Sequence, residues 1–520
     1  MAYELTGYHA VTADSGDKEE GIERRDVLRA TAIAGIAGVL GVPSVGSVAA
    51  QEDEDEIDHA QWPELEDPYE YAVARDQYER SMSTEAKLMA SAVFMTGRDP
   101  EEYIHNDVID HTPLFFDWDD VDIEIDEENQ LVTLLVPRIP PVRAQYNGDQ
   151  GATILPRGAR EVAFAPVEVP RNLPNPERTD WPIGDQNAET EDPDVDQEGL
   201  EEALDFAFEQ SEETASDLPE TRGVVVVHDG DIVAERYADG FDINSQFEIW
   251  SMTKSVTATL FGILVQQGHF DTEDYVYPYI DSWEEDEPRS EIKFKHLLQM
   301  AGGLRYTQHD EDLIITRTTG HDHWRIYTEA LDVYEQAEHL PLEHDPGEHW
   351  AYRNANPLNI ARVMRDFVEE NGCAGVNNFL RFPQAALFDQ IGCRDTVLEP
   401  DMYGNIIPSG FNYMSARDNA RYGLLHLQDG RFNGEQLLSP EYVDFLRTGS
   451  PANENYGGLF WVNTNQELLE DVPEDTYYAS GFHTNRSYIV PSHDVVIARH
   501  GRDATHDPNT FVRMVLDAVE

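Results

Sequence analysis

Residues 247–265 of the 520-residue chain read FEIWSMTKSVTATLFGILV. The apolar run from Val256 onward is typical of a buried helix, and Gly268 is a suitable place for that helix to end. Residues three apart share one face of a helix. We therefore expect Ser251 and Lys254 to lie together at the buried first turn.

This pair has a chemical and a structural interpretation. A serine hydroxyl is a poor nucleophile unless a base lies beside it. A lysine can be that base if burial or a cationic neighbour lowers its pKa toward neutrality, and a buried helix start supplies both desolvation and a positive dipole. Alternatively, Ser251 only caps the helix and the Lys254 head group reaches solvent. Taken alone, the Ser251–Lys254 pair favours neither the chemical nor the structural interpretation.

The spacing Ser-x-x-Lys occurs three times in the chain, so context must separate the matches. Ser15 lies in a polar stretch ahead of a candidate export signal, and Ser290 lies among charged residues, where Lys293 is expected to stay solvated and protonated. We interpret both as coincidence. The chain has no P-loop Gly-Lys, no Gly-x-Ser-x-Gly elbow and no His-Glu-x-x-His.

Patterns on both sides of the helix indicate one sheet built from two distant parts of the chain. The expected elements are a helix at 199–210, strands at 223–227 and 232–236, a mostly helical region at 252–447, strands at 458–462, 487–490 and 495–498, and a helix at 510–519. Asp229-Gly230 is typical of a tight hairpin turn. The sequence thus predicts an α+β fold, with an antiparallel sheet and an inserted helical region.

Two further stretches carry candidate site residues. In Tyr352-Arg353-Asn354, the tyrosine and asparagine are two apart, and one extended loop can present both to a cleft. His483-Thr484-Asn485 precedes a strand, where side chains can bind a polar group of a substrate and a backbone N–H can help to hold an oxyanion. A buried tyrosine with a turn asparagine, and a plain loop entering a strand, are the structural alternatives.

Together, Ser251-Met252-Thr253-Lys254, Tyr352-Arg353-Asn354 and His483-Thr484-Asn485 resemble the three motifs of serine beta-lactamases and DD-peptidases: Ser-x-x-Lys, Tyr-x-Asn and Lys/His-Thr/Ser-Gly. The chain looks like the class C-type branch, which includes esterases and 6-aminohexanoate-dimer hydrolases. Supporting stretches are 249–255, 296–304 and 416–423, and residues 91–98 look like an N-terminal extension of some members. The resemblance covers roughly 199–520. It implies a beta-lactamase/transpeptidase-like fold with a small N-terminal α/β extension.

The resemblance also implies roles for individual residues. Ser251 would attack an amide or ester carbonyl, with Lys254 as its base and Tyr352 as the relay of the proton to the leaving group. Backbone N–H groups of Ser251 and of the strand near Asn485 would hold the oxyanion. Asn354 would orient Lys254 or a substrate amide.

The third motif departs from the family pattern at its last position. That position is normally glycine, and Asn485 stands there; in another register, Phe482 takes the Lys/His position and Thr484 the glycine position. In either register a side chain is expected to crowd the oxyanion edge. The departure argues against beta-lactam turnover and leaves the role of His483 open.

The N-terminal part of the chain divides by composition. Residues 1–50 resemble a twin-arginine export signal, in which Arg24-Arg25 precede an Ala/Gly-rich run; an uncleaved membrane anchor is the alternative. We interpret residues 51–66 as an acidic disordered tail, 67–185 as an extension module with a helix at 69–94 and a hairpin at 121–136, 186–198 as a linker, and 199–520 as the hydrolase domain.

The charge of the whole chain is extreme. There are 102 acidic and 36 basic residues, giving a net charge of −66, and only five of the basic residues are lysines. This charge excludes a nucleic-acid binder that neutralises phosphates and does not suit an anionic membrane surface. The acidic residues are spread along the chain, and molar salt shortens the Debye length to about 3 Å. We interpret the composition as that of a halophilic protein.

Cysteine and histidine suggest two further features. In an exported protein, Cys373 and Cys393 could form one disulfide, and two free buried thiols are the alternative. Four histidines could suggest a metal site, namely His321, His323, His344 and His349, but no third ligand stands at a recognisable spacing. We expect no metal and no cofactor.

The sequence therefore predicts an exported, halophilic serine hydrolase that acts on small amides or esters. The alternatives are a true beta-lactamase or DD-peptidase and a catalytically silent surface-binding protein of the same fold. The sequence leaves the oligomeric state open, and it predicts membrane association only if the signal stays attached.

Overall fold

The computed structural model describes residues 77–108, 118–137, 139–188, 193, 195–210, 216–285, 287–305, 327, 332–502 and 507–520. The expected export signal, the acidic tail and Ser15 lie outside these residues, as do His321 and His323. No helix in the described ranges is both long enough and apolar enough to cross a bilayer.

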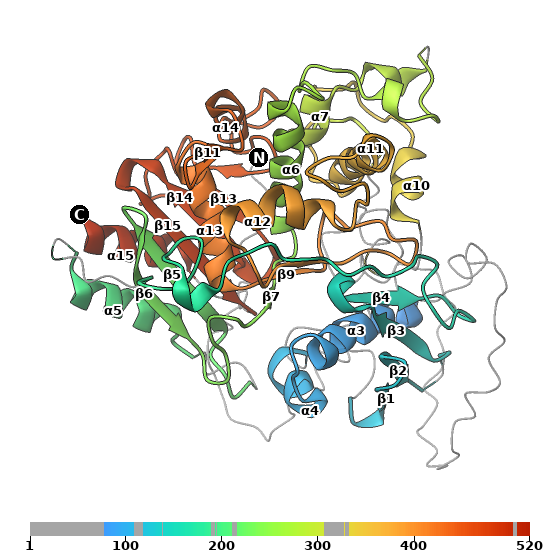
Figure 1. The fold of residues 1–520 in the computed structure, drawn as a ribbon, viewed down its shortest axis with the longest axis horizontal. Coiled ribbons are helices and arrows are strands. Elements are labelled where there is room, and N and C mark those ends of the chain that lie inside the picture. Colours follow the sequence, from blue (N-terminus) through green and yellow to red (C-terminus); the bar gives the residue numbers. More distant parts are fainter. Residues whose placement is uncertain are drawn as a thin grey trace, which may run out of the picture.

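The main sheet has six antiparallel strands in the order β12-β13-β14-β15-β5-β6 (Figure 1). The strands are β12 (Trp461–Val462), β13 (Tyr477–Ser480), β14 (Arg486–Val490), β15 (Val495–Gly501), β5 (Thr221–His228) and β6 (Asp231–Tyr237). β5 and β6 come from before the helical region and the other four from after it, so the expected sheet is confirmed. β13 was not predicted, and β12 is shorter than the expected strand at 458–462.

Alternating residues of β5 divide the core into two layers. Val224 and Val226 pack with α5 (Gln197–Ala207) and α15 (Pro508–Val519) on one face of the sheet. Val225 and Val227 belong to the core of the other face, which α13 (Ala416–Leu427) and α6 (Met252–Gln266) share. Figure 1 shows α5 and α15 together, away from α13.

The inserted region is mostly helical, as expected. It contains α6, α7 (Phe294–Leu298), α10 (Val333–Glu338), α11 (Ala355–Asn371), the π-helix η8 (Gln384–Phe388), α12 (Asp389–Ile391), α13 and α14 (Pro440–Leu446). It also holds two small sheets that were not predicted: β7 (Phe247–Glu248), β9 (Asn412–Met414) and β8 (Val397–Leu398), and the pair β10 (Arg431–Phe432) and β11 (Glu435–Gln436). β9 holds β7, just before Ser251, in place.

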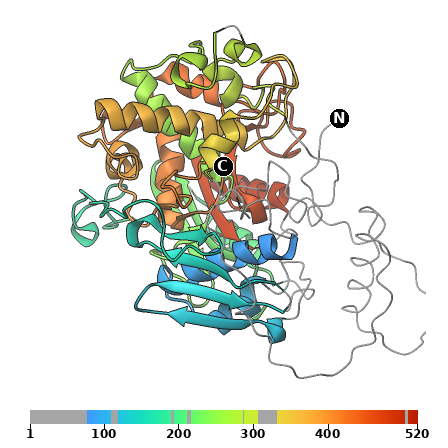
Figure 2. The same cartoon turned by 90° about the vertical axis from the view of Figure 1, so that its right-hand side faces the viewer.

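The N-terminal module is a four-stranded antiparallel sheet covered by one long helix. Its elements are α3 (Gln77–Phe94), α4 (Pro100–Tyr103), β1 (Asp122–Asp126), β2 (Leu131–Leu135), β3 (Val142–Tyr146) and β4 (Ala152–Leu155), with the strands in sequence order. The predicted hairpin is β1–β2. Figure 2 shows the module, in blue and cyan, below the helices of the inserted region, in green to orange. Buried residues of α3 belong to the same continuous core as α6.

Candidate active site

Ser251 and Lys254 meet at the start of α6. Ser251 is the residue before the first turn, and Lys254 Nζ lies 2.8 Å from Ser251 Oγ. The preceding residue, Trp250, has a φ of 45°, a left-handed conformation that a bulky side chain rarely adopts. Its ring packs against Phe411 and Phe482, with centroids 5.5 and 5.8 Å away. These contacts hold the strained turn that presents Ser251.

The carbonyl oxygen of Ser409 joins the members of the site. Lys254 Nζ donates to it at 3.0 Å, the Tyr327 hydroxyl donates to it at 2.7 Å, and Ser251 Oγ lies 3.5 Å away. Neither Ser409 nor Tyr327 was predicted from the sequence. A backbone acceptor leaves no side-chain signature, and Tyr327 belongs to none of the three recognised motifs.

The environment of Lys254 differs from that of the other Ser-x-x-Lys lysine in the described structure. Lys254 is fully buried, and this desolvation lowers its pKa well below the ordinary value of 10.5. Among the described residues no carboxylate forms an ion pair with it. Lys293, by contrast, pairs with Glu273 at 2.9 Å, which raises the pKa of Lys293. Of these two lysines, only Lys254 is placed to be a neutral base.

The second motif lies on the other side of Lys254. The centroid of the Tyr352 ring is 4.8 Å from Lys254 Nζ. Asn354, the residue before α11, is buried and its side chain hydrogen-bonds the Tyr327 hydroxyl. Tyr352 also belongs to an aromatic cluster: its ring stacks on Trp461 at 5.9 Å and meets the edge of Tyr456 at 6.0 Å.

The third motif lies against the backbone that leads to Ser251. A Cβ atom at Gly481 would lie 2.1 Å from the Ile249 carbonyl oxygen, so glycine permits this close approach. His483 and Thr484 both have left-handed backbones, with φ of 61° and 54°. Arg499 fixes this turn by donating to the His483 carbonyl at 2.9 Å and to Thr484 Oγ1 at 2.6 Å.

The prediction that Asn485 crowds the oxyanion edge is wrong. Asn485 has an ordinary extended backbone, and its buried side chain donates to the Phe482 carbonyl at 2.6 Å. Its Oδ1 accepts the Gly501 N–H at 3.0 Å. The side chain thus connects the turn before β14 to the last residue of β15. Thr484, which is the glycine position of the alternative register, has a left-handed backbone, a conformation that glycine adopts freely.

The two cysteines are free and buried, so the disulfide alternative is not what the structure shows. Cys373 Sγ lies 3.2 Å from Gln267 Oε1, whereas Cys393 Sγ lies 3.4 Å from the Asp418 carbonyl oxygen. The thiols pack in different surroundings.

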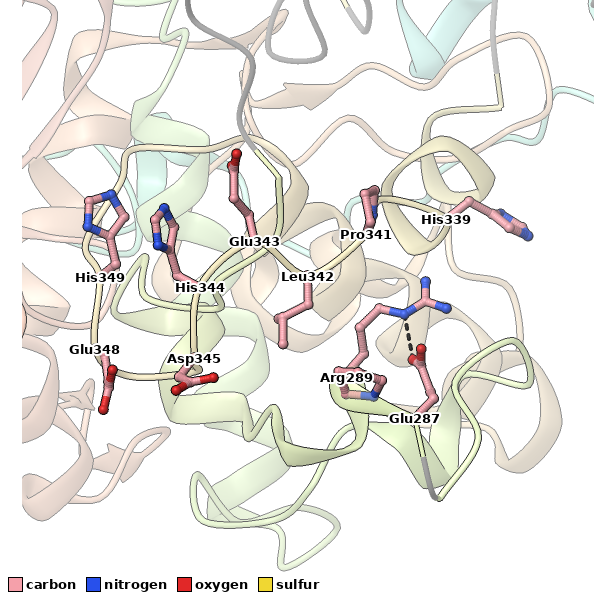
Figure 3. A pocket seen from close by; sticks show the side chains of 11 residues that line it. Glu287, Arg289, His339, Pro341, Leu342, Glu343, His344, Asp345, Glu348 and His349 are labelled. Atoms are coloured by element: carbon pink, nitrogen blue, oxygen red, sulfur yellow. Dashed lines mark hydrogen bonds and ion pairs between the residues drawn. The ribbon is translucent and has the colours of Figure 1, made fainter.

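A pocket of about 860 Å³ lies beside the second motif but does not include it. Its lining includes His344, Asp345, Glu348 and His349, and Figure 3 shows the two histidine rings side by side. Their centroids are 4.1 Å apart. In the part of the chain that the structure describes, no three histidine, cysteine or acidic side chains are grouped to hold a metal ion.

Two curated proteins are similar to slightly more than half of this chain. The 6-aminohexanoate-dimer hydrolase of Paenarthrobacter ureafaciens is 24% identical over 306 residues, which are 58% of this chain and 71% of that protein. An uncharacterised protein of Alkalihalophilus pseudofirmus is 22% identical over 53% of this chain and 82% of its own length.

A solved structure shows the same fold. It is a candidate 6-aminohexanoate-dimer hydrolase from Bacillus anthracis, 20% identical, with a TM-score of 0.50, and the match covers 66% of this chain and 88% of that one. The family model described as Beta-lactamase matches residues 212–507. Because this match spans more than half of the chain and includes all three motifs, the protein belongs to the beta-lactamase family of hydrolases.

Proposed function

We propose that this protein is a serine hydrolase that cleaves amide or ester bonds through an acyl-enzyme on Ser251, with Lys254 as the base. The observation that carries the proposal is the 2.8 Å distance between Lys254 Nζ and Ser251 Oγ. Burial without a carboxylate partner favours the neutral amine. A lysine whose aliphatic chain is buried but whose amine reaches solvent would have neither the short distance to Ser251 nor the buried amine.

In the proposed reaction, the Ser251 hydroxyl gives its proton to the neutral Lys254 amine as Oγ bonds to the substrate carbonyl carbon. The carbonyl oxygen takes up the negative charge. The tetrahedral intermediate then collapses and the bond to the leaving group breaks. The proton held by Lys254 passes by way of Tyr352 to that group, which returns Lys254 to the neutral amine. Water attacks the acyl carbon, supplies the hydroxyl of the product acid and returns a proton to Ser251 Oγ.

The surrounding groups have supporting roles in this proposal. The Ser409 carbonyl accepts from Lys254, which keeps the amine beside Ser251. The N–H of Ser251 and one from the turn after Gly481 would hold the oxyanion, since this turn lies against Ile249. Asn354 would act through Tyr327, and His483 and Thr484 would border the acyl group.

A slim, linear substrate suits the site best. The exposed Phe482 ring packs against Trp250, the residue before Ser251. The Tyr352 ring lies near Lys254 and stacks on Trp461, so aromatic surfaces lie close to the reacting pair. The relative from Paenarthrobacter ureafaciens is named for a linear amide dimer, which makes linear amides and short esters the first substrates to test. We also propose that the enzyme works outside the cell in high salt, on the basis of residues 1–50 and the net charge of −66.

The decisive experiment is covalent labelling with a fluorophosphonate in about 3 M salt, where the charge is screened, together with hydrolysis of a nitrophenyl ester. The wild type and Ser290→Ala should label and hydrolyse alike, and Ser251→Ala should do neither. Ser290 is the matched control because its lysine, Lys293, is bound to Glu273. If Ser251→Ala labels normally, the nucleophile is elsewhere. If the wild type does not label, the silent binding protein becomes the better interpretation.

A further inference from the structure

The N-terminal module contacts the active-site scaffold through one face of α3. Thr84 Oγ1 donates to the Tyr327 carbonyl at 2.6 Å, and Lys87 Nζ lies 4.2 Å from the centroid of the Phe411 ring. The Tyr327 hydroxyl donates to the Ser409 carbonyl, and Phe411 is two residues beyond Ser409. The module therefore touches two neighbours of the carbonyl that holds Lys254.

The main connection between module and site is the buried carboxylate of Glu399. It forms an ion pair with Lys87, which is also buried. Its Oε1 accepts from Ser91 Oγ at 2.8 Å and from the Ala152 N–H at 2.7 Å. All three donors come from the module, on α3 and β4. A Cβ atom on Gly151 would lie 2.3 Å from Oε1, so glycine leaves the room for this carboxylate.

From Glu399, hydrogen bonds continue to the turn that carries Ser409. The Glu399 N–H donates to Asn412 Oδ1 at 2.6 Å, and the Glu399 carbonyl accepts from the Ile407 N–H at 3.0 Å. Asn412 Nδ2 lies 2.8 Å from the Gly410 carbonyl oxygen and 2.9 Å from Thr253 Oγ1, one residue before Lys254. The bonds of Asn412 thus span the turn from 407 to 412 and reach α6.

We propose that Glu399 is a positioning residue through which the N-terminal module holds the Ser409 carbonyl against Lys254. The proposal rests on the proposed function, because it assigns Lys254 as the base. Removal of Lys87 would leave Glu399 buried without its counter-charge. A shift of the Glu399 backbone would then move the 407–412 turn. A displacement on the order of 1 Å at reacting groups can lower a rate about 10²-fold.

The test separates misplacement from loss of folded protein. In about 3 M salt, the number of active sites is counted by complete fluorophosphonate labelling, and kcat for a nitrophenyl ester is expressed per labelled site. Lys87→Met should lower kcat per labelled site roughly 10- to 100-fold while KM changes less than about twofold. If Lys87 only stabilises the fold, Lys87→Met should lower the number of labelled sites and leave kcat per labelled site unchanged.

Glu79→Gln is the matched control. Glu79 is a buried acid on the same helix, but its partner, Arg157, belongs to the module as well. This variant should keep wild-type kcat per site. If Lys87→Met also keeps the wild-type kcat per labelled site, the positioning proposal is overturned. If Lys87→Met does not fold, Ser91→Ala, which removes one donor to Glu399 Oε1, decides by the same measurement. Activity that survives in Ser251→Ala would refute the proposed function instead.

Discussion

At the scale of single residues, the surroundings of a lysine decide its chemistry. Lys87 and Lys254 are both buried, yet Lys87 is paired with Glu399 and Lys254 is bonded to a hydroxyl and a carbonyl oxygen. Lys293 is paired at the surface with Glu273. Only a lysine that loses water without gaining a carboxylate is driven toward the neutral form.

Lys254→Ala should therefore lower kcat for ester hydrolysis by a factor on the order of 10³ or more, because base and nucleophile act as a unit. Lys254→Arg should be equally inactive, since a guanidinium does not deprotonate in proteins. For the wild type, kcat/KM should rise with pH as the amine loses its proton. Because burial lowers the pKa of Lys254, this rise should be complete well below pH 10.5.

A pH–rate profile of the wild type from pH 4 to 10 measures where kcat/KM rises, and the same assay gives the kcat of the two Lys254 variants. A rise that appears only near the ordinary lysine pKa would show that Lys254 is charged in the resting enzyme. Lys295→Ala is the control, because that surface lysine pairs with Glu273 and lies outside the site; its profile should match the wild type.

Asn485 gives a second prediction at this scale. Its side chain bonds to the backbone of Phe482 and Gly501, so Asn485→Gly leaves the buried Gly501 N–H and the partly buried Phe482 carbonyl without this partner. The free energy of unfolding should fall by about 1–3 kcal/mol, measured by denaturant unfolding in high salt. Nitrocefin turnover should not rise, since no obstruction is removed.

The control for this substitution is Asn433→Gly. Asn433 is exposed and has a φ of 46°, a conformation that glycine adopts freely. Its stability should be unchanged or slightly higher. A gain in nitrocefin turnover by Asn485→Gly would restore the crowding hypothesis.

At the scale of elements, the sequence predicted the helices and strands whose side chains form a clear pattern. The β5–β6 hairpin follows from Asp229-Gly230, which lie at φ of 50° and 92°. The α6 helix and its Ser251–Lys254 pair follow from an apolar run with the right spacing. By contrast, β13 has four residues and β9 three, too few to show an alternation. Ser409 acts through its backbone, so nothing in its side chain indicated the role.

Gly481 connects β13 to the site, which gives an element-scale prediction. Gly481→Ala would place a Cβ atom 2.1 Å from the Ile249 carbonyl oxygen, and backbone atoms cannot give way cheaply. The turn after β13 should move away from Ser251, and kcat/KM should fall about 10²-fold, measured with a nitrophenyl ester.

Gly199→Ala, in the first turn of α5, is the comparison variant. Its nearest contact would be 3.0 Å, to a side-chain oxygen of Asp196, far less severe than at Gly481. It should retain wild-type kcat/KM. If Gly481→Ala is as active as Gly199→Ala, the third motif does not have to lie close to Ile249 for catalysis.

At the scale of the whole molecule, acidic residues of the described part of the chain gather on exposed faces. On α5, Glu198, Glu201, Glu202 and Asp205 are exposed, and among the described residues only Arg236 forms ion pairs with this face. The edge strand β1 and its turn expose Asp122, Glu124, Asp126, Glu127 and Glu128. Such faces repel themselves in dilute salt.

Stability should therefore depend strongly on salt. In about 0.1 M salt, carboxylates interact across a Debye length of about 10 Å, whereas in about 3 M salt that length is about 3 Å. Dialysis from high to low salt should abolish most of the helical circular dichroism signal and the esterase activity together. Sucrose at matched osmolality is the control, because it favours compact states by exclusion without screening charge. Full rescue by sucrose, or a thermal midpoint equal at the two salt concentrations, would show that charge repulsion does not limit this fold.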